Sequence, residues 1–131
     1  MKTRASFLLA WCAIAVASCE RPRQRARKLL EKVGAGALRH EAALLYKDLF
    51  AAERPGLITI KRNDWPASFR ALQPLTVGAY RDGFAIAIER GSEGESGIYV
   101  IPSQMDVEPR GTQRTRFERL AEGIYWYSFD L

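Results

Sequence analysis

Between residues 38 and 52, apolar side chains recur with the spacing of an α-helix. The segment Arg54-Pro55-Gly56 then ends the pattern, because proline and glycine both interrupt helices. We therefore expect one amphipathic helix here, with a single apolar face available to cover another layer. Its apolar stripe has spacings of four, three and four and consists of Leu38, Ala42, Leu45 and Leu49.

From residue 76 onward the pattern changes to a period of two, which is typical of β-strands. In FAIAIER, Phe84, Ile86 and Ile88 share one face, and Asp82-Gly83 before it predicts a hairpin with a two-residue type I′ turn. Helix first and antiparallel strands afterwards predict an α+β fold, in which an N-terminal helix packs on an antiparallel sheet of about four to five strands in two layers. The other strand candidates are GLITIK, TVGAYR, GIYVI, TRFERL and GIYWYSF.

The last candidate strand is apolar on both faces. Tyr125 and Tyr127 point one way, and Trp126 points the other, because side chains alternate along a strand. A strand of this kind is usually covered on both sides, which would make all of these rings core. If a helix covers only the Trp126 face, the tyrosines form an exposed aromatic platform, and such patches mark contact sites. The candidate binding residues are therefore Tyr125 and Tyr127, with Tyr99 from GIYVI as a neighbour.

The N-terminus has the anatomy of a secretory signal. Lys2 and Arg4 form a positive start, residues 7–16 are apolar, and Ala17-Ser18 are small. The apolar run has ten residues, whereas about 20 are needed to cross a bilayer as a helix. This pattern predicts an exported protein.

The segment Val16-Ala17-Ser18-Cys19 resembles the lipobox of bacterial lipoproteins. The resemblance implies that a diacylglyceryl group is attached to the Cys19 sulfur, that the chain is cut before Cys19, and that a further acyl chain, commonly palmitate, caps the new amino group. Glu20 follows Cys19, where this class often uses aspartate for inner-membrane retention. We therefore expect a lipid-anchored envelope protein at the outer membrane, facing the periplasm. The alternative is an ordinary secretory signal in which Cys19 is incidental.

Charge and composition divide the chain into three predicted parts. These are a signal peptide (1–18), a lipidated cysteine with a basic tether (19–34), and one small domain (35–131). The whole chain has a net charge of +5, but residues 33–131 carry 12 basic and 13 acidic residues. Because the basic residues then belong to the signal and tether, we expect the domain not to bind nucleic acid.

Candidate catalytic groups are few. His40 is the one histidine of the chain, and it sits among charged residues of the predicted helix. The acidic pairs Asp64 with Asp82 and Glu93 with Glu95 are conceivable acid–base groups, but no spacing favours either pair. Both cysteines are assigned to the signal and the anchor, so no cysteine-based metal site is expected, and no cofactor motif is present.

These observations favour a non-enzymatic binding or interaction module, held on the membrane through Cys19, with an envelope protein or a glycan as partner. Two alternatives stay open. One is a hydrolase acting on an envelope polymer, with His40 or an acidic pair as its base. The other is a structural subunit of a larger envelope complex.

Overall fold

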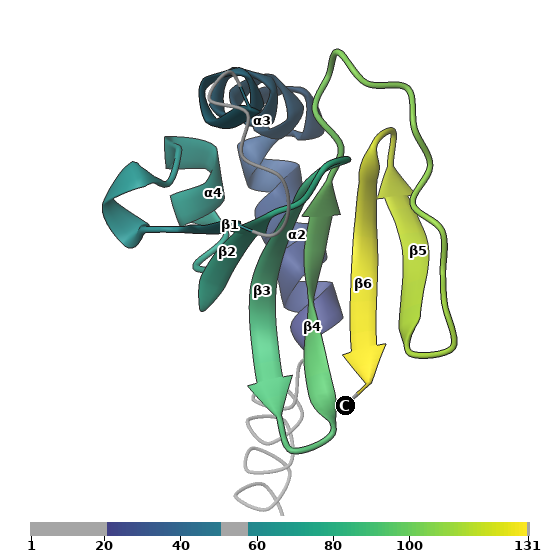
Figure 1. The fold of residues 1–131 in the computed structure, drawn as a ribbon. Helices are drawn as coiled ribbons and strands as arrows, with labels where there is room; N and C mark the ends of the chain where they lie inside the picture. The colour runs from purple at the N-terminus through teal and green to yellow at the C-terminus, as the bar shows by residue number, and fades with distance from the viewer. Residues whose placement is uncertain (1–20, 51–57, 131) are drawn as a thin grey trace, which may run out of the picture.

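A computed structural model describes residues 21–50 and 58–130 (Figure 1). Cys19, the rest of the lipobox and the predicted signal peptide lie outside the described residues. The described helices are α2 (Pro22–Val33), α3 (Ala35–Phe50) and α4 (Ala67–Ala71), with a 3-10 turn η1 (Arg62–Asp64). The strands are β1 (Ile58–Ile60), β2 (Thr76–Ala79), β3 (Phe84–Gly91), β4 (Gly94–Val100), β5 (Thr115–Ala121) and β6 (Ile124–Asp130).

The strands form one antiparallel sheet in the order β1-β2-β3-β4-β6-β5. The predicted α+β class is therefore confirmed, although the sheet has six strands rather than four to five. All of the predicted strand segments take part. Figure 1 shows α2 crossing behind the centre of the sheet, so the helices cover one face of the sheet.

The predicted hairpin at Asp82-Gly83 joins β2 to β3, but its turn is not of the predicted type. Ala79 pairs with Phe84, and the Tyr80 N–H donates to the Gly83 carbonyl at 2.8 Å. Four residues therefore separate the paired strands, and the turn is centred on Arg81-Asp82 rather than on Asp82-Gly83. Neither Asp82 nor Gly83 has the positive φ that a type I′ turn requires. The Asp82-Gly83 dipeptide predicted the position of the hairpin correctly. The alternation of apolar residues on either side of it did not show at which residues the pairing of β2 with β3 ends.

Helix α2 belongs to the folded domain, which corrects the predicted boundary at residue 34. Ala26 is fully buried and Leu30 is 6% exposed, and both belong to the main core. The sequence suggested a basic tether here because basic residues outnumber apolar residues in this segment. The spacing of four between Ala26 and Leu30 nevertheless suffices to bury one side of a helix.

The main core lies between the helices and the sheet. Leu38 and Ala42 from the predicted α3 stripe are fully buried there, and Phe69 and Phe84 meet edge to face with ring centroids 5.6 Å apart. A partly buried carboxylate links α3 to α4, since Glu41 Oε2 accepts hydrogen bonds from the Ser68 N–H at 3.0 Å and the Ser68 hydroxyl at 2.6 Å. Within the described ranges, no helix is both long enough and apolar enough to cross a bilayer.

Candidate functional site: a pocket on the uncovered face of the sheet

The three tyrosines predicted to share a surface lie together on the face of the sheet that the helices do not cover. Tyr99 pairs with Tyr125 across β4 and β6, and the rings of Tyr99 and Tyr127 are 6.4 Å apart. Trp126 lies on the opposite face, in the core under the helices. The alternation of β6 therefore placed its three rings, Tyr125, Trp126 and Tyr127, on the correct faces.

The expectation that these tyrosines form an exposed platform is wrong. Tyr99 is 6% exposed, Tyr127 is 4% exposed and Tyr125 is half-buried. The connection between β4 and β5 contributes to this burial, since Ile101 and Met105 pack in the same cluster. The alternative from the sequence, in which the rings on both faces of the last strand are core, describes Tyr127 and Trp126 correctly.

An arginine from the helical layer holds this connection in place. Arg39 Nε donates to the Ile101 carbonyl at 2.9 Å, and Arg39 Nη2 donates to the Pro102 carbonyl at 3.3 Å and to the Met105 carbonyl at 3.4 Å. Gly123 lies directly against the guanidinium: a Cβ there would come within 2.3 Å of Arg39 Nε, and its φ of +67° also favours glycine. The start of the connection is therefore fixed by a residue more than 60 positions earlier in the chain.

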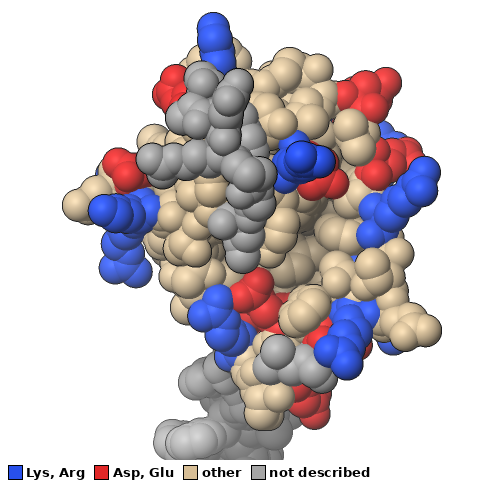
Figure 2. Space-filling view, in the orientation of Figure 1, with Lys and Arg blue, Asp and Glu red and all other residues tan. Residues whose placement is uncertain are grey.

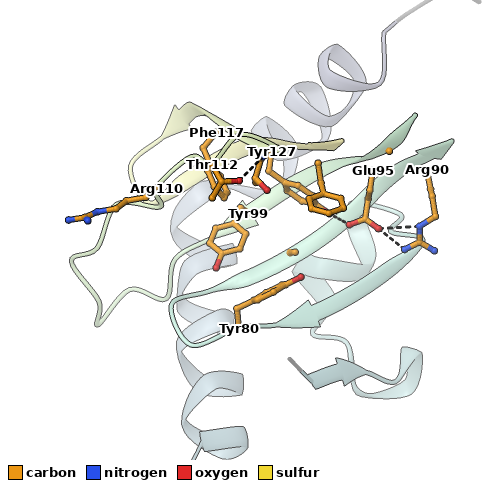
Figure 3. Close-up of a pocket in the computed structure, with 12 residues that line it drawn as sticks. Tyr80, Arg90, Glu95, Tyr99, Arg110, Thr112, Phe117 and Tyr127 are labelled. Carbon is orange, nitrogen blue, oxygen red and sulfur yellow. Dashed lines mark hydrogen bonds and ion pairs between the residues drawn. The ribbon is translucent and has the colours of Figure 1, made fainter. Parts of the chain in front are cut away.

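The buried tyrosines line a pocket of about 580 Å³ rather than a flat platform (Figure 3). Tyr80 and Phe129 add more exposed rings, with exposed fractions of 41% and 39%. On this side of the molecule, basic and acidic side chains lie close to one another, with uncharged surface between them (Figure 2). The lining residues are Tyr80, Ala85, Arg90, Gly94, Glu95, Tyr99, Arg110, Thr112, Thr115, Phe117, Tyr127 and Phe129.

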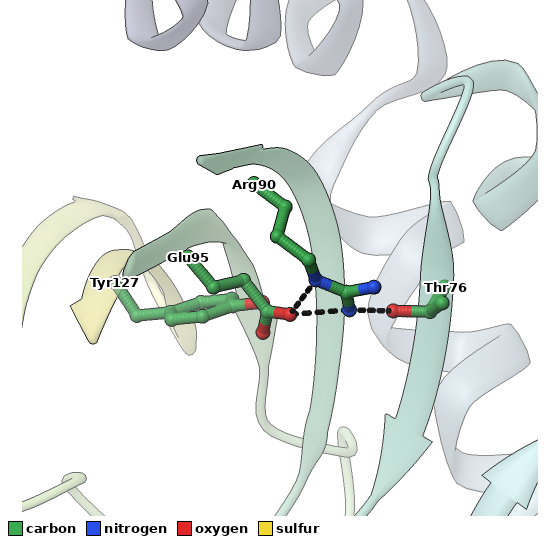
Figure 4. A network of polar contacts seen from close by, with 4 residues as sticks. All are labelled: Thr76, Arg90, Glu95 and Tyr127. Atoms are coloured by element: carbon green, nitrogen blue, oxygen red, sulfur yellow. Dashed lines mark hydrogen bonds and ion pairs between the residues drawn. The ribbon is translucent and has the colours of Figure 1, made fainter. Parts of the chain in front are cut away.

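One end of the pocket carries a network of polar contacts (Figure 4). Arg90 donates to Glu95 Oε1 from Nε at 3.1 Å and from Nη2 at 2.6 Å, and Nη2 also donates to Thr76 Oγ1 at 3.0 Å. The Tyr127 hydroxyl donates to the second Glu95 oxygen at 2.8 Å. Both oxygens of the Glu95 carboxylate are therefore held, and the carboxylate is fixed in direction.

The tyrosine hydroxyls of the pocket stay protonated at neutral pH. Burial raises the pKa of Tyr127, and its hydrogen bond to Glu95 raises this pKa further. Burial likewise raises the pKa of Tyr99, whose hydroxyl donates to Asp82 Oδ1. Burial and the negative charge of Glu95 also raise the pKa of Tyr80. The pocket thus presents neutral rings with a fixed carboxylate and a guanidinium at its end.

The predicted catalytic candidates do not converge in this pocket. His40 is exposed on α3 and borders a different hollow with Leu44 and Gln104. Asp64 is exposed in η1, whereas its suggested partner Asp82 accepts the Tyr99 hydrogen bond. Glu93 and Glu95 both border a polar hollow at the β3–β4 turn, but only Glu95 also lines the aromatic pocket. Over residues 21–50 and 58–130, no group of three or more metal-ligating side chains is placed to hold an ion.

Sequence reasoning missed several residues of the pocket. Phe117 pairs with Tyr127 in the β5–β6 hairpin, so extending the alternation to TRFERL would have placed it on the same face. Arg90 and Glu95 pair across the β3–β4 turn, and their opposite charges at symmetric positions were a usable signal. Tyr80 carried no such signal, because it lies in the four-residue loop.

Comparison of the chain with protein-family models, with curated proteins and with solved structures finds no match.

Proposed function

We propose that this protein is a lipid-anchored binding module of the bacterial envelope and that the aromatic pocket is its binding site. The single observation that carries the proposal is the pocket itself, in which exposed rings stand beside a fixed pair of opposite charges. Concave, mostly apolar sites with a few placed polar groups are typical of ligand binding. The anchor is proposed from the lipobox, with Cys19 as the acylated residue.

The chemistry of the lining favours a glycan segment as the ligand. A sugar ring offers a C–H face, which packs on an aromatic ring, and hydroxyl groups, which both donate and accept hydrogen bonds. Tyr80 and Phe129 supply partly exposed rings, and Arg90 and Glu95 supply a donor and an acceptor beside them. A pocket of about 580 Å³ suits a short segment of a polymer rather than a protein surface.

The arrangement favours binding over hydrolysis. Hydrolysis of a glycoside usually requires two carboxyl groups on either side of the scissile bond. Among the described residues that line the aromatic pocket, Glu95 is the one carboxylate, so the second carboxyl group is missing there. A hydrolase built on His40 would have to act elsewhere, because His40 borders a different hollow.

The proposal predicts that Tyr80→Ala weakens binding without weakening the fold. Tyr80 is 41% exposed, so its loss should change the free energy of unfolding by no more than about 0.5 kcal/mol, while removing one ring from the ligand. Co-sedimentation of the full mature protein with purified cell-wall glycan measures binding. Leu44→Ala is the matched control, because Leu44 is 54% exposed but lies on α3, outside the pocket.

We expect wild type and Leu44→Ala to sediment with the glycan and Tyr80→Ala to remain in the supernatant. Equal sedimentation of all three proteins would show that the pocket is not the glycan site. Steady release of sugar fragments by the wild-type protein would instead support the hydrolase alternative.

A further inference from the structure

The outer face of α2 carries a continuous basic stripe. The helix buries Ala26 and Leu30 against the core, so the side opposite to them faces away from the sheet. The stripe has spacings of four, three and four, which place its members on one side of a helix along the whole length of α2. Its members are all exposed and are Arg21, Arg25, Lys28 and Lys32.

The helix dipole favours Lys32, which lies in the last turn of α2, but it does not explain the basic residues at the start of the helix. The N-terminal end of a helix carries a partial positive charge, so basic residues there are unfavourable and acidic residues are favourable. The first turn of α2 has no acidic residue, Arg21 is the N-cap residue, and no side chain caps the helix. An anionic surface beside this end would relieve the repulsion and would complement the stripe.

The proposed anchor is close to this helix in the sequence. Cys19 precedes the first residue of α2, Pro22, by three positions, and a fully extended chain spans at most about 3.6 Å per residue. If Cys19 is acylated, the start of α2 lies within about 11 Å of the anchored residue. That distance is close to the screening length of about 8 Å at physiological ionic strength.

We propose that the basic stripe of α2 docks on anionic phospholipid headgroups and thereby turns the aromatic pocket away from the membrane. The orientation follows from the two layers, since α2 packs on β3 and β4 from behind, whereas the pocket opens on the opposite face of the sheet (Figure 1). This inference rests on the proposed lipid anchor and adds a fixed orientation to it. The pocket would then face ligands in the aqueous space rather than lipids.

The test uses the acylated mature protein on vesicles of phosphatidylcholine, with and without phosphatidylglycerol. If Cys19 is acylated, the mature chain has no other cysteine, because Cys12 leaves with the signal. One exposed position on each face can therefore carry a fluorophore through Gln24→Cys on α2 or Arg119→Cys on β5. Quenching by spin-labelled headgroups reports which face lies on the bilayer.

We expect the label at residue 24 to be quenched in vesicles that contain phosphatidylglycerol, and the label at residue 119 to be unaffected. Each charge near an anionic surface is worth up to about a fivefold change in the docking equilibrium. Replacing the four residues of the stripe by glutamine should therefore abolish the lipid dependence, as should high salt. The matched control should keep the lipid dependence. It replaces four other exposed basic residues by glutamine, namely Lys47, Lys61, Arg81 and Arg114.

Several results would overturn the inference. The first is equal quenching of the label at residue 24 in vesicles with and without phosphatidylglycerol, while the protein stays bound to both. The second is quenching of the label at residue 119 rather than of the label at residue 24. A third is tighter, salt-sensitive binding of the stripe to a DNA duplex than to anionic vesicles. If the protein binds neither kind of vesicle and mass spectrometry finds no acyl group on Cys19, the lipid anchor is refuted, and the proposed orientation is refuted with it. The glycan co-sedimentation experiment does not depend on this result.

Discussion

Trp126 and Tyr127 are neighbours in β6 that point to opposite sides of the sheet, and both are nearly buried, with exposed fractions of 8% and 4%. One packs under the helices and the other packs against the rings of the pocket. One alternative from the sequence was that Trp126 is buried and Tyr127 is exposed, so that only Trp126 would matter for stability. Both side chains are buried, so this alternative is wrong.

We therefore predict that Trp126→Ala and Tyr127→Ala each lower the free energy of unfolding by about 3–5 kcal/mol, the usual cost of truncating a buried aromatic side chain. Urea denaturation monitored by circular dichroism measures both variants. Tyr127→Phe separates the ring from its hydroxyl and should lose only about 1 kcal/mol, the typical net value of one hydrogen bond. A stability of Tyr127→Ala equal to that of wild type would mean that the pocket wall contributes nothing to the fold.

The raised pKa values of Tyr99 and Tyr127 predict an alkaline limit of stability. Above the ordinary tyrosine pKa of 10.0, the unfolded chain releases these protons while the folded chain retains them. Stability is therefore fully present below about pH 10 and falls as the pH rises further. Urea midpoints measured between neutral pH and pH 11 should show this fall, and the double variant Tyr99→Phe and Tyr127→Phe should flatten it. An unchanged slope in the double variant would assign the alkaline limit to other groups.

At the scale of elements, α2 is a structural part of the domain. Besides Ala26 and Leu30 in the core, it packs the partly buried Leu29 and Val33 against that core. A chain of residues 34–131, which the predicted boundary would define as a complete domain, lacks all four contacts. We therefore expect residues 34–131 not to fold independently.

We predict that residues 34–131 lose at least about 3–5 kcal/mol relative to residues 21–131, because burial of leucine alone is worth about 2–5 kcal/mol. Small domains have a total stability of about 5–15 kcal/mol, so the shorter chain should be partly or wholly unfolded. Near-ultraviolet circular dichroism and urea denaturation compare the two chains. A cooperative transition at the same midpoint for both would restore the boundary at residue 34.

Local pattern predicted the elements of this fold better than it predicted their environment. The stripe from Leu38 to Leu49 and the alternation from Phe84 onward found α3 and β3, because one face of each is apolar. The burial of Tyr99 was not predictable in the same way, since it depends in part on a connection that Arg39 holds from a distant helix. Such long-range contacts leave no periodic signal in the sequence.

At the scale of the whole molecule, the charge distribution differs from the one inferred from the sequence. Residues 21–130 carry 18 basic and 14 acidic residues, so the described domain has a net charge of +4 rather than the −1 of residues 33–131. The expectation that it does not bind nucleic acid therefore loses its original basis, because six of these basic residues lie on α2 or at its N-cap. The vesicle and duplex measurements decide between the two kinds of anionic partner.

The lipobox leads to a prediction about the whole chain. Cys19→Ala should abolish acylation and leave an uncleaved or mis-cleaved precursor, because the thiol is the acceptor of the diacylglyceryl group. Metabolic labelling with a palmitate analogue followed by gel analysis measures the label, and Cys12→Ala is the matched control because it leaves the lipobox intact. Undiminished label in Cys19→Ala would contradict the lipoprotein interpretation.

The position of β6 in the sheet determines when folding can finish. Although it is the last described strand in the chain, it lies between β4 and β5, pairing with both. A growing chain that has reached only residue 121 therefore has β5 complete but without a partner, while β4 has an open hydrogen-bonding edge. The helices α2 and α3 are made first and yet lack Ile124 and Trp126 from the core that they cover. The complete sheet and its core therefore form only after the final described strand has been synthesised.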